Sequence, residues 1–162
     1  KLDPDNRLFG RRDLRRLEGE AIRDSMLAVS GLLDRKMYGP GTLNEAMTRR
    51  SLYFFVKRSR LIPTMMVFDA PEPLVSIGAR PTTTIAPQAL HFMNNPQVRR
   101  YAAAFAKRLP AEDPVAGAYR LALGRSPSPD ESELARKSLA QGLSHTDLCQ
   151  AILSLNEFVY VD

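Results

Sequence analysis

Apolar positions in residues 14–33 recur every three to four residues, which is the repeat of an amphipathic helix. Asp13 precedes this stripe as an N-cap, and the stripe consists of Leu14, Leu17, Ala21, Ala28 and Leu32. We expect Gly31 or the charged cluster at 34–36 to end the helix. The sequence Gly39-Pro40-Gly41 then predicts a turn.

Residues 51–57, SLYFFVK, form a short aromatic and β-branched run with the composition of a strand. A strand requires a partner, and residues 65–67 or residues 74–77 would supply it. The sequence therefore predicts at most a small β-hairpin at the edge of a helical body.

Four helices are predicted after residue 95, each with its own start signal. Asn95 and Asp113 are N-caps followed by proline, Ser128 opens a capping box with Glu131, and Ser144 caps the last helix. Pro110, Gly124 and Gly142 mark the ends of the first three, and EFVYVD is expected as an extended tail. Because the connections are short, we expect a mainly α fold with antiparallel C-terminal helix pairs. Residues 1–162 are expected to form a single α-rich domain, with a possible division into 1–95 and 96–162.

A long polar and proline-rich segment, residues 68–95, interrupts these helices. Pro71, Pro73 and Pro81 remove backbone donors, so some fifteen residues are expected to be irregular. A helix then begins near Thr84 or Ala86, covers residues 88–93 and ends at Asn94-Asn95-Pro96. A polar loop that leads into a helix N-terminus is a common place for function, but internal ordering networks have the same composition.

This segment supplies the candidate site residues, which either bind a ligand or order the loop: Asp69, Glu72, Arg80, Thr83, Thr84, Gln88, Asn94 and Asn95. Asp69 and Glu72 are the only acids between Glu45 and Glu112, and two carboxylates can divide acid and base roles. The competing interpretation is structural. Asp69 then forms a buried or half-buried bridge with Arg80, and the threonines and Gln88 serve as caps.

Composition narrows the function further. The chain is 44% hydrophobic and 25% charged, as in an ordinary globular protein, and it has no apolar run long enough to span a membrane. Residues 1–60 hold 14 Lys and Arg against 8 Asp and Glu, but no recognition motif accompanies them, so we expect no specific nucleic-acid binding. The first residues lack the apolar core of a signal peptide, so an export signal is expected upstream.

Metal and nucleophile chemistry find little support in the sequence. His91 and His145 have no partners at ligand spacing, so we expect no metal site, and His91 is expected to pack beside Phe92. The single Cys149 is expected to be a small core residue. Without a Cys-x-x-Cys-His motif, we expect no cofactor in this segment, and any haem would lie elsewhere.

Several ordered motifs resemble the planctomycete-specific C-terminal domain, a family without an assigned activity. They are FDAPEP, Arg80 with Thr83-Thr84, Gln88-Ala89-Leu90, Asn94-Asn95, the upstream Arg49-Arg50-Ser51-Leu52-Tyr53, AYRLALGRSPSPDE and the closing DLCQAILSLNEFVYVD. The resemblance implies the C-terminal part of a large exported protein, often one that carries a cytochrome-c-like haem segment. Residues 37–48 are shorter than the corresponding family connection, so this loop is expected to be truncated.

Two functions from different classes remain open. The first is a non-catalytic structural or interaction module of an exported multidomain protein, whose partner is another domain of the same polypeptide or a separate protein. The alternative is an enzyme or a carbohydrate-binding domain centred on residues 68–95. Convergence of the candidate side chains in an open pocket would favour the alternative, whereas bonds among themselves or to the backbone would favour the first.

Overall fold

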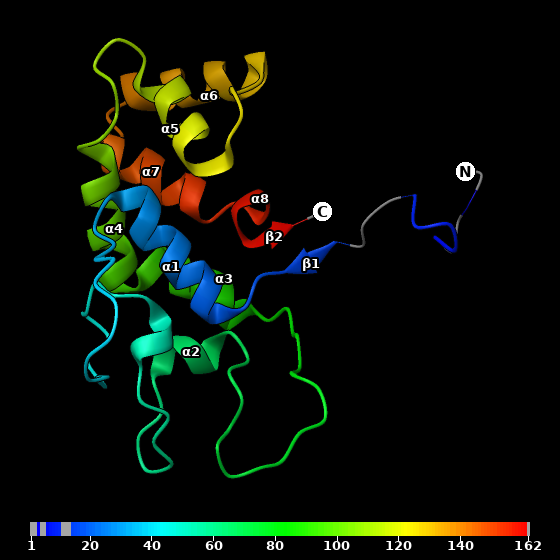
Figure 1. Ribbon diagram of the computed structural model, residues 1–162. Coiled ribbons are helices and arrows are strands. Elements are labelled where there is room, and N and C mark those ends of the chain that lie inside the picture. Colours follow the sequence, from blue (N-terminus) through cyan, green and yellow to red (C-terminus); the bar gives the residue numbers. More distant parts are fainter. Residues whose placement is uncertain (1–2, 4–5, 11–13, 162) are drawn as a thin grey trace.

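Figure 1 shows the computed structural model of this chain, which describes residues 3, 6–10 and 14–161. Within these residues the fold has eight α-helices and one two-stranded antiparallel sheet, which confirms the predicted mainly α class. The N-cap predicted at Asp13 lies outside the described residues. The elements are α1 (Gly19–Ser30), α2 (Pro63–Val67), α3 (Ala86–Asn94), α4 (Pro96–Ala106), α5 (Pro114–Leu123), α6 (Pro129–Ala140), α7 (His145–Leu153), α8 (Asn156–Val159), β1 (Arg15–Arg16) and β2 (Tyr160–Val161).

Helices α1, α4 and α7 form the centre of the fold. Helix α4 packs against both α1 and α7, so its main neighbours are distant in sequence. Their facing side chains are fully or almost fully buried, and the same cluster includes Phe68, Phe92 and residues of α5, α6 and α8. The core residues from the three helices are Ile22, Met26, Leu27, Val98, Tyr101, Ala102, Phe105, Cys149, Ile152 and Leu153.

The predicted start signals in the C-terminal half are confirmed. The Asn95 side chain accepts a hydrogen bond from the Gln97 amide at 2.8 Å, and Asp113 accepts one from Ala116 at 3.2 Å. Ser128 and Ser144 each form a capping box with the acidic residue three positions later. These caps satisfy amides that the first helical turn leaves without partners, which is why local sequence is sufficient to place them. Two helices end earlier than predicted. Helix α4 ends at Ala106 and not at Pro110, and α6 ends at Ala140 and not at Gly142.

The first helix begins later than its apolar stripe predicts. Leu14 is exposed, and residues 15–16 are the strand β1, which pairs with β2 in the register Arg15 to Val161 and Arg16 to Tyr160. The amide of Leu17 extends this pairing through a 2.8 Å bond to the carbonyl of Val159. Pairing with the far end of the chain therefore overrides the local helical pattern. The end of α1 at Gly31, with φ of 75°, is as predicted.

The strand predicted at residues 51–57 is wrong. Residues Ser51–Tyr53 form a 3-10 helix, and the following residues make only isolated bridges, between Thr42 and Phe54 and between Lys57 and Arg60. Neither proposed partner strand forms, because residues 65–67 belong to α2 and residues 74–77 lie in an irregular loop. The C-terminal tail also differs from its prediction, since α8 precedes β2 and buries Phe158.

Residues 68–85 contain no helix or strand, as the prolines predict. In Figure 1 this loop is drawn in green after α2. It extends from the same side of the molecule as the loop that leads into α2, residues 54–62. None of the helices in the described ranges has the length and apolar character needed to cross a bilayer.

Candidate functional site

Asp69 lies at the centre of the proline-rich segment and is surrounded by donors. It follows α2 with φ of 60°, a left-handed conformation that Asp tolerates better than most residues. Its carboxylate accepts hydrogen bonds from the Thr83 amide at 2.7 Å and the Thr83 hydroxyl at 2.8 Å. Arg16 adds an ion pair in which Nη2 lies 2.5 Å from Oδ2. The carboxylate is thus engaged by β1 and by the other end of its own loop.

Arg80 does not bind the Asp69 carboxylate, so the predicted bridge between these two side chains is wrong. The Nε of Arg80 donates to the backbone carbonyl of Asp69 at 2.9 Å. Its terminal nitrogens pair with Glu20 at 2.9 Å and Glu18 at 3.4 Å. The prediction is wrong because each side chain binds a partner from a distant part of the sequence. Asp69 pairs with Arg16, and Arg80 pairs with the acids at the start of α1.

Gln88 closes the N-terminus of α3. The side chain is buried, and its Nε2 donates to the carbonyls of Val67 at 3.0 Å and Thr83 at 3.2 Å. Its Oε1 accepts from the amide of Ile85 at 3.4 Å. The neighbouring Thr84 hydroxyl lies 2.9 Å from the hydroxyl of Tyr160, in β2. These bonds occupy the groups that would otherwise face a ligand at the helix N-terminus.

The remaining candidates lie apart from this network. Asn95 is the N-cap of α4, and its Nδ2 is 3.3 Å from Nδ1 of His91. Asn94 and Glu72 are exposed, and no ion pair or side-chain hydrogen bond joins either to another described residue. The structure therefore brings Asp69, Arg80, Thr83, Thr84 and Gln88 together, through bonds to one another, to the backbone, to β1 and α1, and to β2, but not in an open pocket.

A second polar cluster is buried beneath the segment 45–51. The Arg23 side chain, 2% exposed, donates to the carbonyls of Arg49 at 3.0 Å and Met47, and to the Ser51 hydroxyl at 3.1 Å. Burial lowers the pKa of Arg23 from its ordinary value. Arg23 thus replaces regular secondary structure as the group that holds this segment against α1.

Aromatic and sulfur groups near these clusters behave as core residues. The His91 ring packs edge-on against Phe68 at 5.5 Å, and burial lowers the pKa of this imidazole from its ordinary value. Burial likewise raises the pKa of the Cys149 thiol to about 12. The His91 ring also lies edge-on to Phe92, with 6.1 Å between the ring centroids, and Cys149 is buried in the core, so both residues pack as predicted. Among the residues that the structure describes, no group of three or more His, Cys, Asp or Glu side chains is arranged to hold a metal ion.

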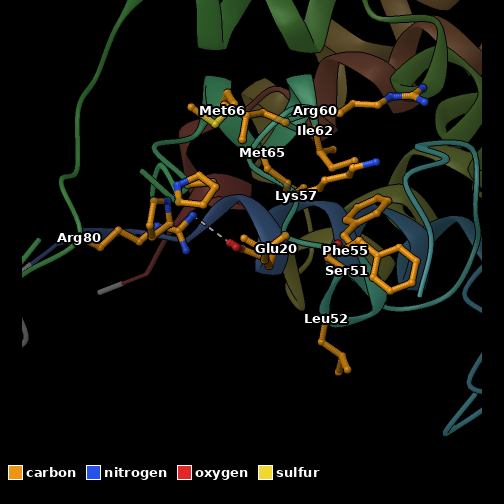
Figure 2. Close-up of a pocket in the computed structure, with 16 residues that line it drawn as sticks. Glu20, Ser51, Leu52, Phe55, Lys57, Arg60, Ile62, Met65, Met66 and Arg80 are labelled. Carbon is orange, nitrogen blue, oxygen red and sulfur yellow. Dashed lines mark ion pairs between the residues drawn. The ribbon is translucent and has the colours of Figure 1, made fainter. Parts of the chain in front are cut away.

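An apolar groove, which sequence reasoning missed, lies beside the proline-rich segment (Figure 2). It has a volume of about 410 Å³ and is bounded by residues 51–57, residues 60–66 and residues 70–80. Ile62 and Met65 form its buried floor, whereas Leu52 and Phe55 at its rim are 59% and 53% exposed. The sequence does contain a sign of this groove. The segment SLYFFVK has apolar side chains at successive positions, more than one face of a strand can bury, so some of them are left exposed.

Some of the charged side chains that line the groove form ion pairs, and others do not. Glu20 on one wall is neutralised by Arg80, and the Ser51 hydroxyl is occupied by Arg23. Lys57 and Arg60 also line the groove, and neither takes part in an ion pair between described residues. The groove therefore combines an apolar surface with an uncompensated positive charge.

Two other hollows on the surface are weaker candidates for a binding site. A more open depression of about 460 Å³ runs along α1, but its acids Glu18, Glu20 and Asp24 are paired with Arg80 or Arg50. An apolar cavity of about 210 Å³ lies between α5, α6 and α7 and has the exposed Leu134 in its lining. The groove beside residues 70–80 differs from both because the exposed Leu52 and Phe55 occur there together with cations that form no ion pair within the described part of the chain.

Comparison with known proteins gives a family but no activity. No curated protein and no solved structure matches the chain. The family model PSD1, described as a protein of unknown function (DUF1553), matches residues 1–139. This match covers most of the 162 residues, and the chain therefore belongs to the PSD1 family.

Proposed function

We propose that this chain is a non-catalytic interaction module of an exported multidomain protein, and that the groove between residues 51–57 and 70–80 binds a segment of the same polypeptide or of a protein partner. The single observation that carries the proposal is the exposure of Leu52 and Phe55 above the buried floor of Ile62 and Met65. Exposed apolar side chains around an apolar hollow, an aromatic ring among them, are typical of protein interfaces.

The bonding of the polar candidates supports the same function. The polar groups of Asp69, Thr83 and Gln88 form hydrogen bonds with one another, with backbone carbonyls and with Arg16. A catalytic or sugar-binding site requires groups that remain available to the substrate. Ordering the loop that forms one wall of the groove is the role that these bonds support best.

The wider context of the module comes from the resemblance of its motifs. We propose that the full protein is exported and that a haem, where the protein has one, is bound by another domain. Fractionation of cells that produce the full protein, with immunodetection of this module, tests the exported location. Recovery in the cytoplasmic fraction alone would contradict it.

The binding function is tested by selecting short peptides from a displayed library on the folded chain. Selected peptides are expected to bind the double variant Leu52→Ser/Phe55→Ser about tenfold more weakly, because aromatic and aliphatic anchors dominate such interfaces. Leu134→Ser is the matched control, since Leu134 is a similarly exposed leucine far from the groove. Failure to select any peptide, or equal loss with the control, would overturn the proposal.

A parallel assay addresses catalysis. The chain is incubated with chromogenic glycosides, esters and phosphate esters, and no turnover is expected. Glu72 is exposed and makes no side-chain bond to a described residue, so Glu72→Gln leaves the fold intact. Turnover that is present in the natural chain and lost in Glu72→Gln would replace the interaction module with an enzyme.

A further inference from the structure

Lys57 and Arg60 lie together at one end of the groove. They are partners in an antiparallel bridge, and the Arg60 amide donates to the Lys57 carbonyl at 3.1 Å. Residues opposite each other in an antiparallel pair direct their side chains to the same face. The turn therefore presents two cations side by side, and both belong to the groove lining.

No acid of the surrounding sequence compensates these cations. Residues 46–68 contain Arg49, Arg50, Lys57, Arg58 and Arg60 and no Asp or Glu. Arg49 and Arg50 are used internally, because Arg49 donates to the carbonyl of Tyr38 and Arg50 pairs with Asp24. Lys57, Arg58 and Arg60 remain, within the described residues, without a carboxylate within ion-pair distance, and of these Lys57 and Arg60 line the groove.

We propose that the occupant of the groove is an apolar protein segment that carries carboxylates, and that these carboxylates bind Lys57 and Arg60; this rests on the proposed function. The apolar side chains of the segment contact Phe55, Ile62 and Met65, and its acids lie at the end formed by the turn. Opposite charges at the rim of an interface select the partner and speed its association more than they add affinity.

The shape and chemistry of the groove favour a protein segment over other acidic ligands. A small-molecule site needs several convergent polar groups, but here Glu20 is paired with Arg80 and Ser51 with Arg23. A membrane surface would contact the outward-facing Leu52 and Phe55 but would leave Ile62 and Met65, which lie buried at the bottom of the hollow, without a partner. An apolar centre with a charged rim is the arrangement found in protein interfaces.

The test uses one peptide selected for groove binding, synthesised in three forms that differ only at the polar positions, which are Glu, Gln or Lys. Fluorescence anisotropy measures the affinity of each form. The Glu form is expected to bind about fivefold tighter than the Gln form, with the difference shrinking as salt is added. In the variant Lys57→Gln/Arg60→Gln the Glu and Gln forms are expected to bind equally, whereas Arg136→Gln/Lys137→Gln on α6 keeps the preference.

The possible outcomes show whether the preference for acidic peptides or the proposed function itself is wrong. If the Gln and Lys forms bind as tightly as the Glu form, the groove binds peptides but the acidic partner is wrong. If no form binds, the proposed function itself fails. Binding to vesicles that contain phosphatidylserine, without binding to any peptide, would assign the cations to a lipid surface and overturn the inference.

Discussion

The buried guanidinium of Arg16 binds the carboxylate of Asp69, with Nη2 2.5 Å from Oδ2, although 53 residues separate them in the sequence. The side chains of Arg16 and Asp69 are only 3% and 12% exposed. This ion pair fastens the proline-rich segment to β1, and the bond between Thr84 and Tyr160 fastens it to β2. The wall of the groove is thus held by both strands of the small sheet.

Breaking this pair from one side is expected to be more harmful than removing both partners. Asp69→Asn leaves a buried cation without its counter-charge, and the free energy of unfolding is expected to fall by about 3 kcal/mol. The double variant Arg16→Met/Asp69→Asn should recover part of that loss. Urea unfolding of the four proteins in the cycle measures the coupling. Arg136→Met, which removes an exposed 3.5 Å pair with Asp113, should change stability by less than about 0.5 kcal/mol. Coupling below that value for Arg16 and Asp69 would contradict the account.

Gly19 marks the point at which β1 gives way to α1. A Cβ at this position would lie 2.9 Å from Cβ of Phe68, which is fully buried in the core. Gly19→Ala is therefore expected to lower the free energy of unfolding by about 1–3 kcal/mol, even though alanine favours helix. Gly78→Ala is the control, because nothing lies within 4 Å of its added Cβ. Thermal unfolding compares the two, and equal melting temperatures would show that Phe68 moves freely.

The Arg125 side chain joins α6 to α8 by binding Glu131 and Glu157, each at 2.7 Å. Its hydrogen bonds are the main cause that lowers the pKa of Glu131 from 4.5 to about 2. Because this pKa is lower in the folded chain than in the unfolded chain, ionised Glu131 stabilises the fold above about pH 4.5, and the contribution is lost as the pH falls toward about 2.

Arg125→Met tests this linkage. The stability difference between the natural chain and the variant is expected to be constant above pH 5 and to narrow as the solution is acidified below about pH 4.5. Titration of the Glu131 carboxyl by NMR should show its pKa rising toward the ordinary value in the variant. An unchanged pKa would mean that the Ser128 amide, not Arg125, holds the carboxylate ionised.

Cys149 should be chemically silent in the folded chain. The thiol is fully buried, and burial raises its pKa to about 12, so little thiolate is present at neutral pH. Its labelling by a thiol reagent at pH 8 is expected to require unfolding and to accelerate in urea in parallel with the loss of helical signal. Rapid labelling of the native chain would place Cys149 at an accessible surface.

Local signals in the sequence were sufficient for the C-terminal half of the fold. The caps at Asn95, Asp113, Ser128 and Ser144 act within one helical turn, so their effects do not depend on distant residues. The start of α1 and the sheet of β1 with β2 depend on pairing between the two ends of the chain, which no short window contains.

The candidate site shows the same division. The composition of residues 68–95 correctly predicts an irregular loop followed by a helix, but Arg16 and Glu20, which bind Asp69 and Arg80, lie outside this segment. The sequence does not reveal the groove, because the composition of SLYFFVK predicts a strand, and pairing in a sheet would cover one face of Phe55. Periodicity cannot distinguish an apolar segment that packs against a strand from one that remains exposed.

The most direct test of the interaction module is the position of a selected peptide on the chain. Methyl NMR spectra of the chain, recorded with increasing peptide, are predicted to show shifts at Ile62, Met65 and Met66, with little change at Leu134 on α6. Shifts confined to the neighbourhood of Leu134, or to Thr83 and Gln88 with the groove methyls unchanged, would contradict the account.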